Sequence, residues 1–205
     1  MAPHAKKTTA KDRLLRAGMA LCTEGGFQAM RLEKVLQQSG VPKGSFYHYF
    51  SSKKAFGLAV IDAYSDYFYA KLQHSLEDET VSPLQRLKNF AQDAENGMQR
   101  HNYLRGCLVG NLGQEMAALD EDFRQRLEAV LKRWEALTQQ CLQAAQQAGE
   151  IHAKLDTAQF AQFFWIGWEG AILHAKLRRS PLPMQLFMDG FVASMRPSLA
   201  PYHNA

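Results

Sequence analysis

Residues 40–54 constrain the fold more tightly than any other part of the chain, reading Gly-Val-Pro-Lys-Gly-Ser-Phe-Tyr-His-Tyr-Phe-Ser-Ser-Lys-Lys. Gly40 follows a segment with helical apolar spacing, which predicts the end of a helix. Pro42 suits the first position of a new helix. Ser51-Ser52 offers an N-cap for the next helix, so the helix between them is short. Two short helices joined by a glycine-containing turn are typical of a helix-turn-helix unit.

The second of these helices has two different faces. At helical spacing Phe46 and Phe50 share one side, where they would anchor the helix to a small core. The other side combines positive charge, hydrogen-bond donors and an aromatic ring, supplied by Lys43, Gly44, Tyr47 and His48. We expect this face to enter the major groove of double-stranded DNA. The alternative is an ordinary surface helix that faces water.

About the first 65 residues resemble the TetR-type bacterial transcriptional repressors. The resemblance rests on the order and spacing of Glu24-Gly25-Gly26-Phe27, Val35-Leu36, Ser39-Gly40-Val41, residues 43–50 and Ser52-Lys53. It implies groove contacts from Lys43, Gly44, Ser45 and Tyr47. It also implies phosphate contacts from His48, Tyr49 and Lys53, although the ring of Tyr49 could instead pack beside Phe46.

One position departs from the family pattern. The family usually has threonine at the start of the second helix, where it caps the helix and binds phosphate, and this chain has Arg31 there. An arginine side chain cannot accept the N–H bonds of a cap. It can still meet a phosphate as a charge, so we keep Arg31 among the expected DNA contacts.

Charge is distributed unevenly along the chain. Residues 1–54 hold ten Lys or Arg and three acids, a net charge of +7, whereas the remainder is mildly acidic. A basic head on an acidic body suits a protein that offers one end to phosphates. Basic heads also bind acidic membranes, but that alternative leaves the helix-turn-helix pattern unexplained.

The remaining sequence is all-helical in its spacing, with no strand-like alternation, repeat or low-complexity tract. We predict a disordered basic arm at residues 1–9 and a three-helix DNA-binding head at 10–56. A long helix at 52–76 joins the head to a helical regulatory and dimerisation body at 57–205. We see no bilayer-spanning run and no secretion signal. Three widely separated cysteines favour a reducing cytoplasm.

Two apolar helices close the chain, one from Asp156 to about residue 173 and one after Ser180-Pro181. The first is apolar on more than one face, which a surface helix of a monomer would not tolerate. We therefore predict that both helices form a homodimer interface, as the family's last two helices do. The expected interface residues are Trp165, Trp168, Ile172, Phe187 and Phe191. The alternative is that these side chains belong to the core.

Cys107 is the candidate sensor. It lies in Arg-Gly-Cys-Leu at the start of a body helix, and Lys176 lies in Ala-Lys-Leu-Arg-Arg-Ser. Both segments are similar to repressors of the N-ethylmaleimide-reductase type, which respond to electrophiles and oxidants. The family's reactive cysteine and its partner lysine map onto Cys107 and Lys176. A helix start and a lysine would favour the thiolate, and a buried inert cysteine is the equally weighted alternative.

The other two cysteines are poorer candidates. Cys22 lies on the apolar stripe of the first helix, and Cys141 lies mid-helix with no adjacent cation in the sequence. If Cys107 is not the trigger, we expect a reversible ligand beside Phe164, Trp168 and His174.

No enzyme motif and no cofactor site is recognisable. His101, His152, His174 and Cys107 fit no metal-ligand spacing, so we predict no metal. The sequence favours a dimeric repressor that a small molecule, electrophile or oxidant releases from a pseudo-palindromic operator. Two alternatives stay open, an electrophile-modifying enzyme that uses Cys107 and a non-specific DNA-binding protein.

Overall fold

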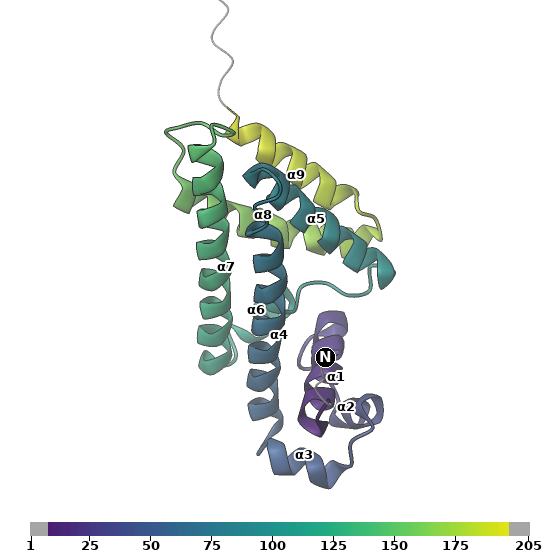
Figure 1. Cartoon of the computed structure of the whole chain (residues 1–205). Helices are drawn as coiled ribbons and strands as arrows, with labels where there is room; N and C mark the ends of the chain where they lie inside the picture. Colours follow the sequence, from purple (N-terminus) through teal and green to yellow (C-terminus); the bar gives the residue numbers. More distant parts are fainter. Residues whose placement is uncertain (1–7, 197–205) are drawn as a thin grey trace, which may run out of the picture. The chain divides into compact units, whose positions relative to one another are not determined.

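The computed structural model describes residues 8–196, and this part of the chain contains helices and no strand (Figure 1). The all-α fold class is therefore confirmed. In chain order the helices are α1 (Ala10–Gly25), α2 (Leu32–Ser39), α3 (Lys43–Tyr49), α4 (Lys53–Leu76), α5 (Pro83–Arg100), α6 (Leu108–Met116), α7 (Glu121–Gln147), α8 (Thr157–Arg178) and α9 (Leu182–Met195).

The described chain forms two compact units. Unit 1 contains the residues up to Tyr67 together with Cys107–Glu128, and so holds α1, α2, α3, α6, the first part of α4 and the start of α7. Unit 2 contains Phe68–Gly106 and the residues from Ala129 onward. The predicted boundary after residue 56 lies inside α4, and the separate roles of a head and a body stay a prediction.

The start and end of α1 follow from local chemistry. Thr9 and Asp12 form a reciprocal capping box, because the Thr9 side chain accepts from the Asp12 N–H and Asp12 accepts from the Thr9 N–H. Thr9, the last residue of the predicted disordered arm, therefore belongs to the helix start. Residues 1–7, with Lys6 and Lys7, lie outside the described part of the chain. At the other end Gly26, with φ of 84°, caps α1.

The turn and the helices beside it match the sequence pattern closely. Gly40 adopts the left-handed conformation (φ 62°, ψ 30°) that ends α2. Pro42 is the N-cap of α3 rather than its first residue, one position earlier than predicted. The Ser52 hydroxyl accepts from the Ala55 N–H at 3.0 Å and so caps the start of α4, as expected.

Aromatic rings form much of the unit 1 core. Phe46 of α3 and Phe50, its C-cap residue, are both buried and pack on Phe56 of α4, with ring centroids 5.2 and 4.9 Å from the Phe56 ring. Leu14 and Cys22 of α1 are fully buried nearby in the same unit. These contacts fix α3 through one face only, and its opposite face is left to solvent.

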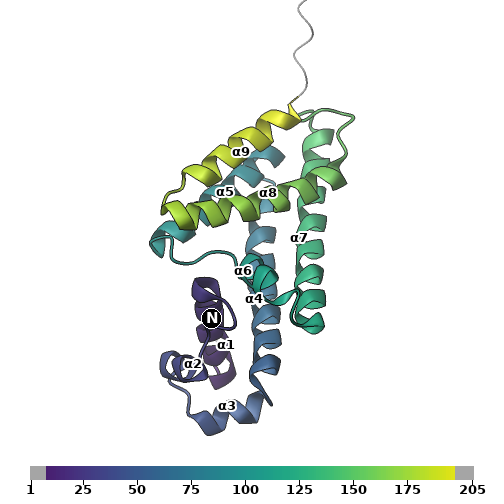
Figure 2. The ribbon, with the colours of Figure 1, turned by 180° about the vertical axis from the view of Figure 1, so that it is seen from behind.

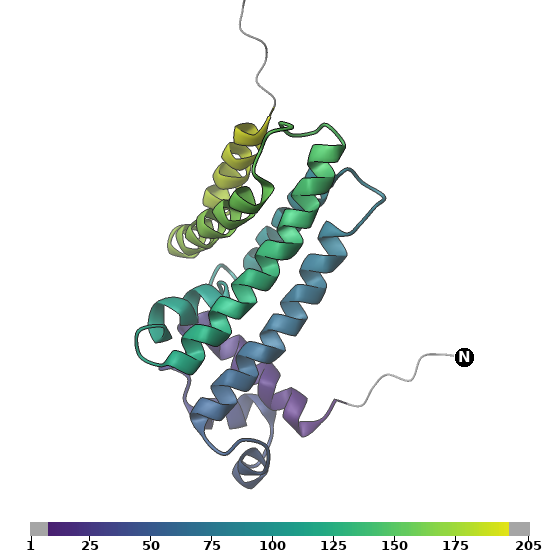
Figure 3. The same cartoon turned by 90° about the vertical axis from the view of Figure 1, so that its left-hand side faces the viewer.

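Unit 2 is built around a second aromatic cluster. Phe68, Phe90, Trp134, Phe164, Trp165 and Trp168 form a chain of ring contacts with centroid distances of 4.4–6.3 Å. The Trp165 indole N–H donates to the Thr138 hydroxyl at 3.0 Å, so its polar atom is satisfied inside the core. Helices α8 and α9 lie side by side (Figure 3).

Candidate nucleic-acid interface and sensor residues

Helix α3 presents a polar and aromatic surface. Lys43, Gly44, Tyr47 and His48 are exposed, and Ser45 is half-buried. The Tyr47 ring is 53% exposed and is supported edge-on by the buried Phe46 ring at 5.3 Å. A Cβ atom at Gly44 would meet nothing within 4 Å, so the backbone there is open to a close approach. The expected groove residues thus share one accessible surface.

The neighbouring Tyr49 is exposed as well. Its ring contacts His48 and Phe50, with centroid distances of 5.1 and 6.3 Å. The sequence left open that the Tyr49 ring packs beside Phe46, but the ring contacts of Tyr49 are with His48 and Phe50 instead. Both His48 and Tyr49 therefore leave polar atoms facing solvent at the end of α3.

Two adjacent lysines at the start of α4 have different environments. Lys54 forms ion pairs of 2.7 Å with Asp120 and Asp122, and these hydrogen bonds raise its pKa and lower that of Asp120. Lys53 is exposed, donates to the Gln28 carbonyl at 3.3 Å and lies over the Phe27 ring. Lys54 is already neutralised, so Lys53 is the better candidate to meet a phosphate.

Arg31 is the N-cap residue of α2 and makes no side-chain capping bond. This agrees with the expectation that arginine cannot accept the free N–H groups of the helix start. Its side chain is exposed. The guanidinium is accordingly available to an anionic partner.

Cys107 is the N-cap residue of α6 and belongs to unit 1. It is 6% exposed, and the Tyr64 hydroxyl donates to its sulfur across 3.9 Å. The N-terminus of a helix carries a partial positive charge, which favours an anion at this position. Lys176 lies on α8 in unit 2, so the pairing of these two residues stays a prediction.

Burial suppresses ionisation of the other two thiols. It raises the pKa of Cys22 to about 12, with a smaller contribution from Glu115. Burial likewise raises the pKa of Cys141 to about 11, against the opposing charge of Arg86. No cation is adjacent to Cys141 in the sequence, but the structure brings Arg86 close to it from another helix. Burial nevertheless outweighs that charge, and both thiols are protonated near neutral pH.

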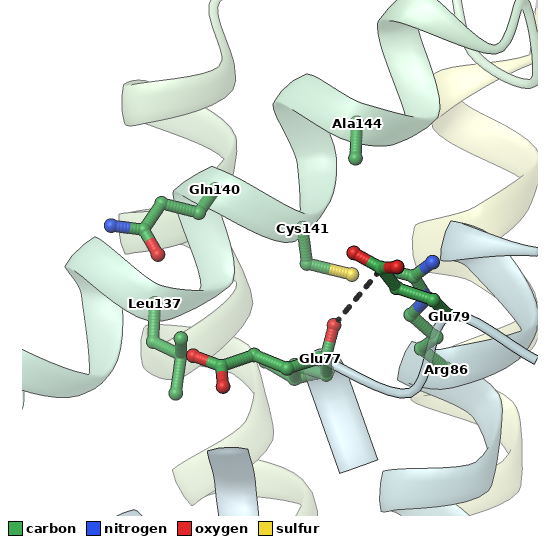
Figure 4. A pocket seen from close by; sticks show the side chains of 8 residues that line it. Glu77, Glu79, Arg86, Leu137, Gln140, Cys141 and Ala144 are labelled. Carbon is green, nitrogen blue, oxygen red and sulfur yellow. Dashed lines mark hydrogen bonds between the residues drawn. The ribbon is translucent and has the colours of Figure 1, made fainter. Parts of the chain in front are cut away.

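A pocket of about 320 Å³ lies in unit 2, lined by Leu76, Glu77, Glu79, Arg86, Leu137, Gln140, Cys141 and Ala144 (Figure 4). Arg86 is fixed there, because its guanidinium donates to the carbonyls of Leu76 and Val81. The Cys141 thiol donates to the Pro83 carbonyl at 3.3 Å. The pocket offers charges of both signs, which suits a small polar molecule without selecting one class.

The alternative ligand residues do not line this pocket. Phe164 and Trp168 are fully buried and stack with centroids 5.6 Å apart, whereas His174 is exposed on the same helix. The Trp168 indole nitrogen has no hydrogen-bond partner. The three side chains therefore differ in environment, and their role as a ligand site stays a prediction.

The predicted dimer-interface residues need correction. Trp165, Trp168 and Phe191 are at most 2% exposed within a single chain, so they belong to the unit 2 core. Ile172 and Phe187 are half-buried. The exposed apolar side chains of these helices are instead Phe163 and five aliphatic residues, Ile166, Leu173, Leu177, Leu182 and Leu186; the aliphatic five form a set of their own. We call this set the aliphatic face.

The aliphatic face had a signal in the sequence. Ile166, Gly170, Leu173 and Leu177 follow one another at spacings of four, three and four, which places them on one stripe of a helix. Because α8 is apolar all round, the larger aromatic residues of the opposite stripe masked this pattern.

Sequence reasoning missed two polar residues of α6, Asn111 and Glu115. Both side chains bond to the backbone of residues 22–28 in unit 1. Their spacing of four, in a helix whose remaining residues are apolar or glycine apart from Gln114 (Leu-Val-Gly-Asn-Leu-Gly-Gln-Glu-Met), was a possible signal. Figure 2 shows α6 beside α1.

Within residues 8–196, no three His, Cys, Asp or Glu side chains gather as a metal ion would require. None of the helices described there is long and apolar enough to cross a membrane.

Two family models match the chain. The model described as bacterial regulatory proteins of the tetR family matches residues 14–60, which include α2 and α3. The model described as a tetracyclin repressor-like C-terminal domain matches residues 83–191.

Curated relatives agree with these matches. The transcriptional regulator AcuR of Cereibacter sphaeroides is 49% identical over 182 residues, covering 89% of this chain and 83% of AcuR. The transcriptional repressor NemR of Escherichia coli K12 is 33% identical over 175 residues, covering 85% of this chain and 88% of NemR.

Solved structures share the fold. A regulatory protein TetR from Rhodobacter sphaeroides superposes with a TM-score of 0.88 at 48% identity, covering 91% of this chain and 98% of that one. The reduced form of Escherichia coli NemR gives a TM-score of 0.83 at 30% identity, covering 93% and 98%. With its helix-turn-helix in unit 1 and regulators rather than enzymes as its relatives, the chain belongs to the TetR family of DNA-binding transcriptional regulators.

Proposed function

We propose that the chain is a homodimeric repressor that binds a pseudo-palindromic operator through α3 and is released when its regulatory part reacts with, or binds, a small molecule. The observation that carries the proposal is the exposed face of α3, held in place by buried rings on the other side. Because its partner is bacterial chromosomal DNA, the repressor would act in the cytoplasm.

In this proposal Lys43, Gly44, Ser45 and Tyr47 approach the base edges. Lysine can donate to the O6 and N7 atoms of guanine, and the small residues allow the helix backbone to come close. Tyr47, which is 53% exposed, offers both a hydroxyl and a ring edge. Two observations support these contacts: the polar face of α3 is accessible to solvent, and buried rings on the other side fix the helix backbone.

Phosphate contacts would come from Arg31, His48, Tyr49 and Lys53, which are all exposed. Such contacts fix the position of a protein on DNA without reading sequence. They also make binding dependent on salt, since each neutralised phosphate releases counterions. Lys53 would have to leave the Gln28 carbonyl or share it.

We infer that two copies pair through the aliphatic face. Family members bind DNA as dimers, and a dimer of helix-turn-helix units matches two half-sites one helical turn apart. Ile166, Leu177 and Leu186 are each at least 70% exposed in the single chain. Burying such side chains in a two-fold contact contributes about 25 cal/mol per Å² of apolar surface.

For the trigger we favour Cys107 over Cys22 and Cys141. The other two thiols have raised pKa values, and Cys107 alone lies at a helix start with a hydroxyl donor beside it. An adduct or an oxidised sulfur at this buried position would not fit the present packing, so it would displace α6. Lys176 would assist by favouring the thiolate.

The test is operator binding before and after a mild electrophile, in wild type and in Cys22→Ser, Cys107→Ser and Cys141→Ser. We expect release in every protein except Cys107→Ser, and a weaker response in Lys176→Ala. Mass spectrometry must show which thiol is modified. If the wild type keeps its affinity for the operator while Cys107 is fully modified, this cysteine is not the trigger.

A further inference from the structure

Two side chains of α6 reach across unit 1 to the backbone of the DNA-binding head. The Asn111 amide donates to the carbonyls of Cys22 and Thr23 at 3.0 and 2.9 Å. These carbonyls belong to the last turn of α1, and the Cys22 carbonyl also accepts from the Gly26 N–H at 3.1 Å. One amide group therefore caps the end of α1 from a residue 88 positions further along the chain.

Glu115 binds the loop that follows. Its carboxylate accepts from the N–H groups of Phe27 and Gln28, with oxygen–nitrogen distances of 2.6 and 2.8 Å. Hydrogen bonds to an ionised acceptor are about twice as strong as neutral ones. A Cβ atom at Gly26 would come within 2.6 Å of the same carboxylate, so only glycine fits beside it.

The loop held by Glu115 leads directly to the helix-turn-helix. The Gln28 carbonyl also accepts a hydrogen bond from the Lys53 ammonium. This bond ties the loop to the start of α4, which follows α3 in the chain. The Phe27 ring packs on Phe123 with centroids 4.8 Å apart. A shift of this loop would therefore be passed to both ends of the segment that contains α2 and α3.

The two α6 residues are in register with Cys107. Cys107, Asn111 and Glu115 are four residues apart, so they follow one another along a single face of the helix. The Asn111 N–H donates to the Cys107 carbonyl at 3.1 Å as the first such bond of α6. Because a helix moves as a stiff body, displacement at Cys107 would move both side chains together.

We propose that Asn111 and Glu115 are positioning residues for operator binding: they clamp the end of α1 and the α1–α2 loop to α6, and so hold α3 in the orientation that fits the groove. Displacement of α6 at Cys107 would loosen or shift this clamp. That second part depends on the proposed function, whereas the clamp itself can be tested without any trigger.

The experiment uses the full-length chain with two isosteric variants, Glu115→Gln and Asn111→Asp. A glutamine at 115 leaves one acceptor oxygen for two N–H donors, and an aspartate at 111 removes both donors to the α1 carbonyls. The matched control is Gln114→Ala, an exposed neighbour on α6. Operator affinity is measured well below the melting temperature, and circular dichroism and sedimentation check folding and dimer formation.

We expect each isosteric variant to bind the operator at least fivefold more weakly and the double variant at least tenfold more weakly, with helicity and dimer unchanged. The Gln114→Ala control should bind like wild type. A merely structural role would lower the melting temperature and leave the affinity of the folded protein unaltered. Wild-type operator affinity in both folded single variants would overturn the proposal.

A second measurement separates this proposal from the Cys107 trigger. The ratio of operator affinities before and after thiol modification is compared in wild type and Glu115→Gln. If thiol modification weakens operator binding by wild type, the affinity ratio of Glu115→Gln should be several-fold closer to one than that of wild type. An equal ratio in the two proteins would contradict transmission through the clamp. If wild type does not respond, the Cys107 trigger fails, and the affinities alone decide the role of the clamp.

Discussion

Helices α3 and α8 are both fixed by buried aromatic rings, but they offer opposite surfaces to solvent. Helix α3 buries Phe46 and exposes Tyr47 beside a lysine, a glycine and a histidine. Helix α8 buries Trp168 between Phe90, Phe164 and Phe187 and exposes aliphatic side chains such as Ile166. The ring cores hold each helix in place, and the exposed residues indicate the partner.

The difference teaches which residues of an amphipathic helix identify its partner. Charged and hydrogen-bonding groups on α3 suit a hydrated polyanion, and the aliphatic face of α8 suits a second protein surface. Large aromatic residues look like interface residues in a sequence because they are apolar and bulky. In α8, Phe164, Trp165 and Trp168 fill the core of their own unit, so exposure rather than size identifies the interface.

The sharpest test of this contrast uses Trp168→Glu and Ile166→Glu on the same helix. Trp168 is fully buried, so Trp168→Glu places an unpaired charge in the core and should abolish folding. Ile166 is 74% exposed, so Ile166→Glu should leave the helical fold intact and convert dimers to monomers at micromolar concentration. Circular dichroism and sedimentation velocity distinguish the two outcomes. A folded Ile166→Glu dimer would exclude Ile166 from the interface.

Adjacent residues of α3 allow the same comparison at the DNA-binding end. Phe46→Ala removes a ring that is 1% exposed and should cost about 3–5 kcal/mol of unfolding free energy. Tyr47→Ala should change stability little and weaken operator binding by about 1–3 kcal/mol. Urea unfolding and fluorescence anisotropy with labelled operator measure the two quantities. Operator binding by Tyr47→Ala at wild-type strength would remove this residue from the interface.

Buried thiols in the two units should make the fold less stable in alkali. Burial holds the pKa of Cys22 near 12 and that of Cys141 near 11, whereas an unfolded cysteine titrates near 8.5. The unfolded state therefore loses these protons first, and stability present below about pH 8.5 is lost as pH rises.

The expected slope is about 1.4 kcal/mol per pH unit for each cysteine. Unfolding of wild type, Cys22→Ala and Cys141→Ala by urea at pH 8, 9 and 10 measures it. Each alanine variant should show a shallower decline, although it is less stable at pH 8. Parallel curves for all three proteins would show that these thiols ionise normally.

The smallest predicted effect concerns the two helix starts of the DNA-binding head. Helix α1 has a complete capping box at Thr9, whereas α2 begins at Arg31 with no side-chain cap. Arg31→Thr should add the missing acceptor and stabilise the protein by about 1 kcal/mol. If Arg31 also meets a phosphate, the same variant should bind DNA more weakly and with a shallower salt dependence. Thermal unfolding and salt-dependent binding test both effects.

Much of the architecture could be predicted from local signals. Gly40, Ser52 and Asp156 mark helix ends or starts in the structure as they do in the sequence. Caps and breakers act through their own backbone and one or two neighbours, so a linear pattern is sufficient to recognise them. The amphipathic pattern of α3 was likewise readable, because Phe46 and Phe50, the residue that follows the helix, are the only phenylalanine or large aliphatic side chains of residues 43–50.

Contacts between distant residues could not be predicted in this way. Asn111 and Glu115 bond to backbone atoms more than 80 positions away, and Arg86 lies near Cys141 although no cation is its sequence neighbour. The cause is physical, because a side chain's burial, partners and pKa depend on which helices pack around it. The sequence by itself therefore determined the helices and the DNA-reading face. Only the tertiary structure decided that Trp165, Trp168 and Phe191 form the core and that α6 holds the α1–α2 loop.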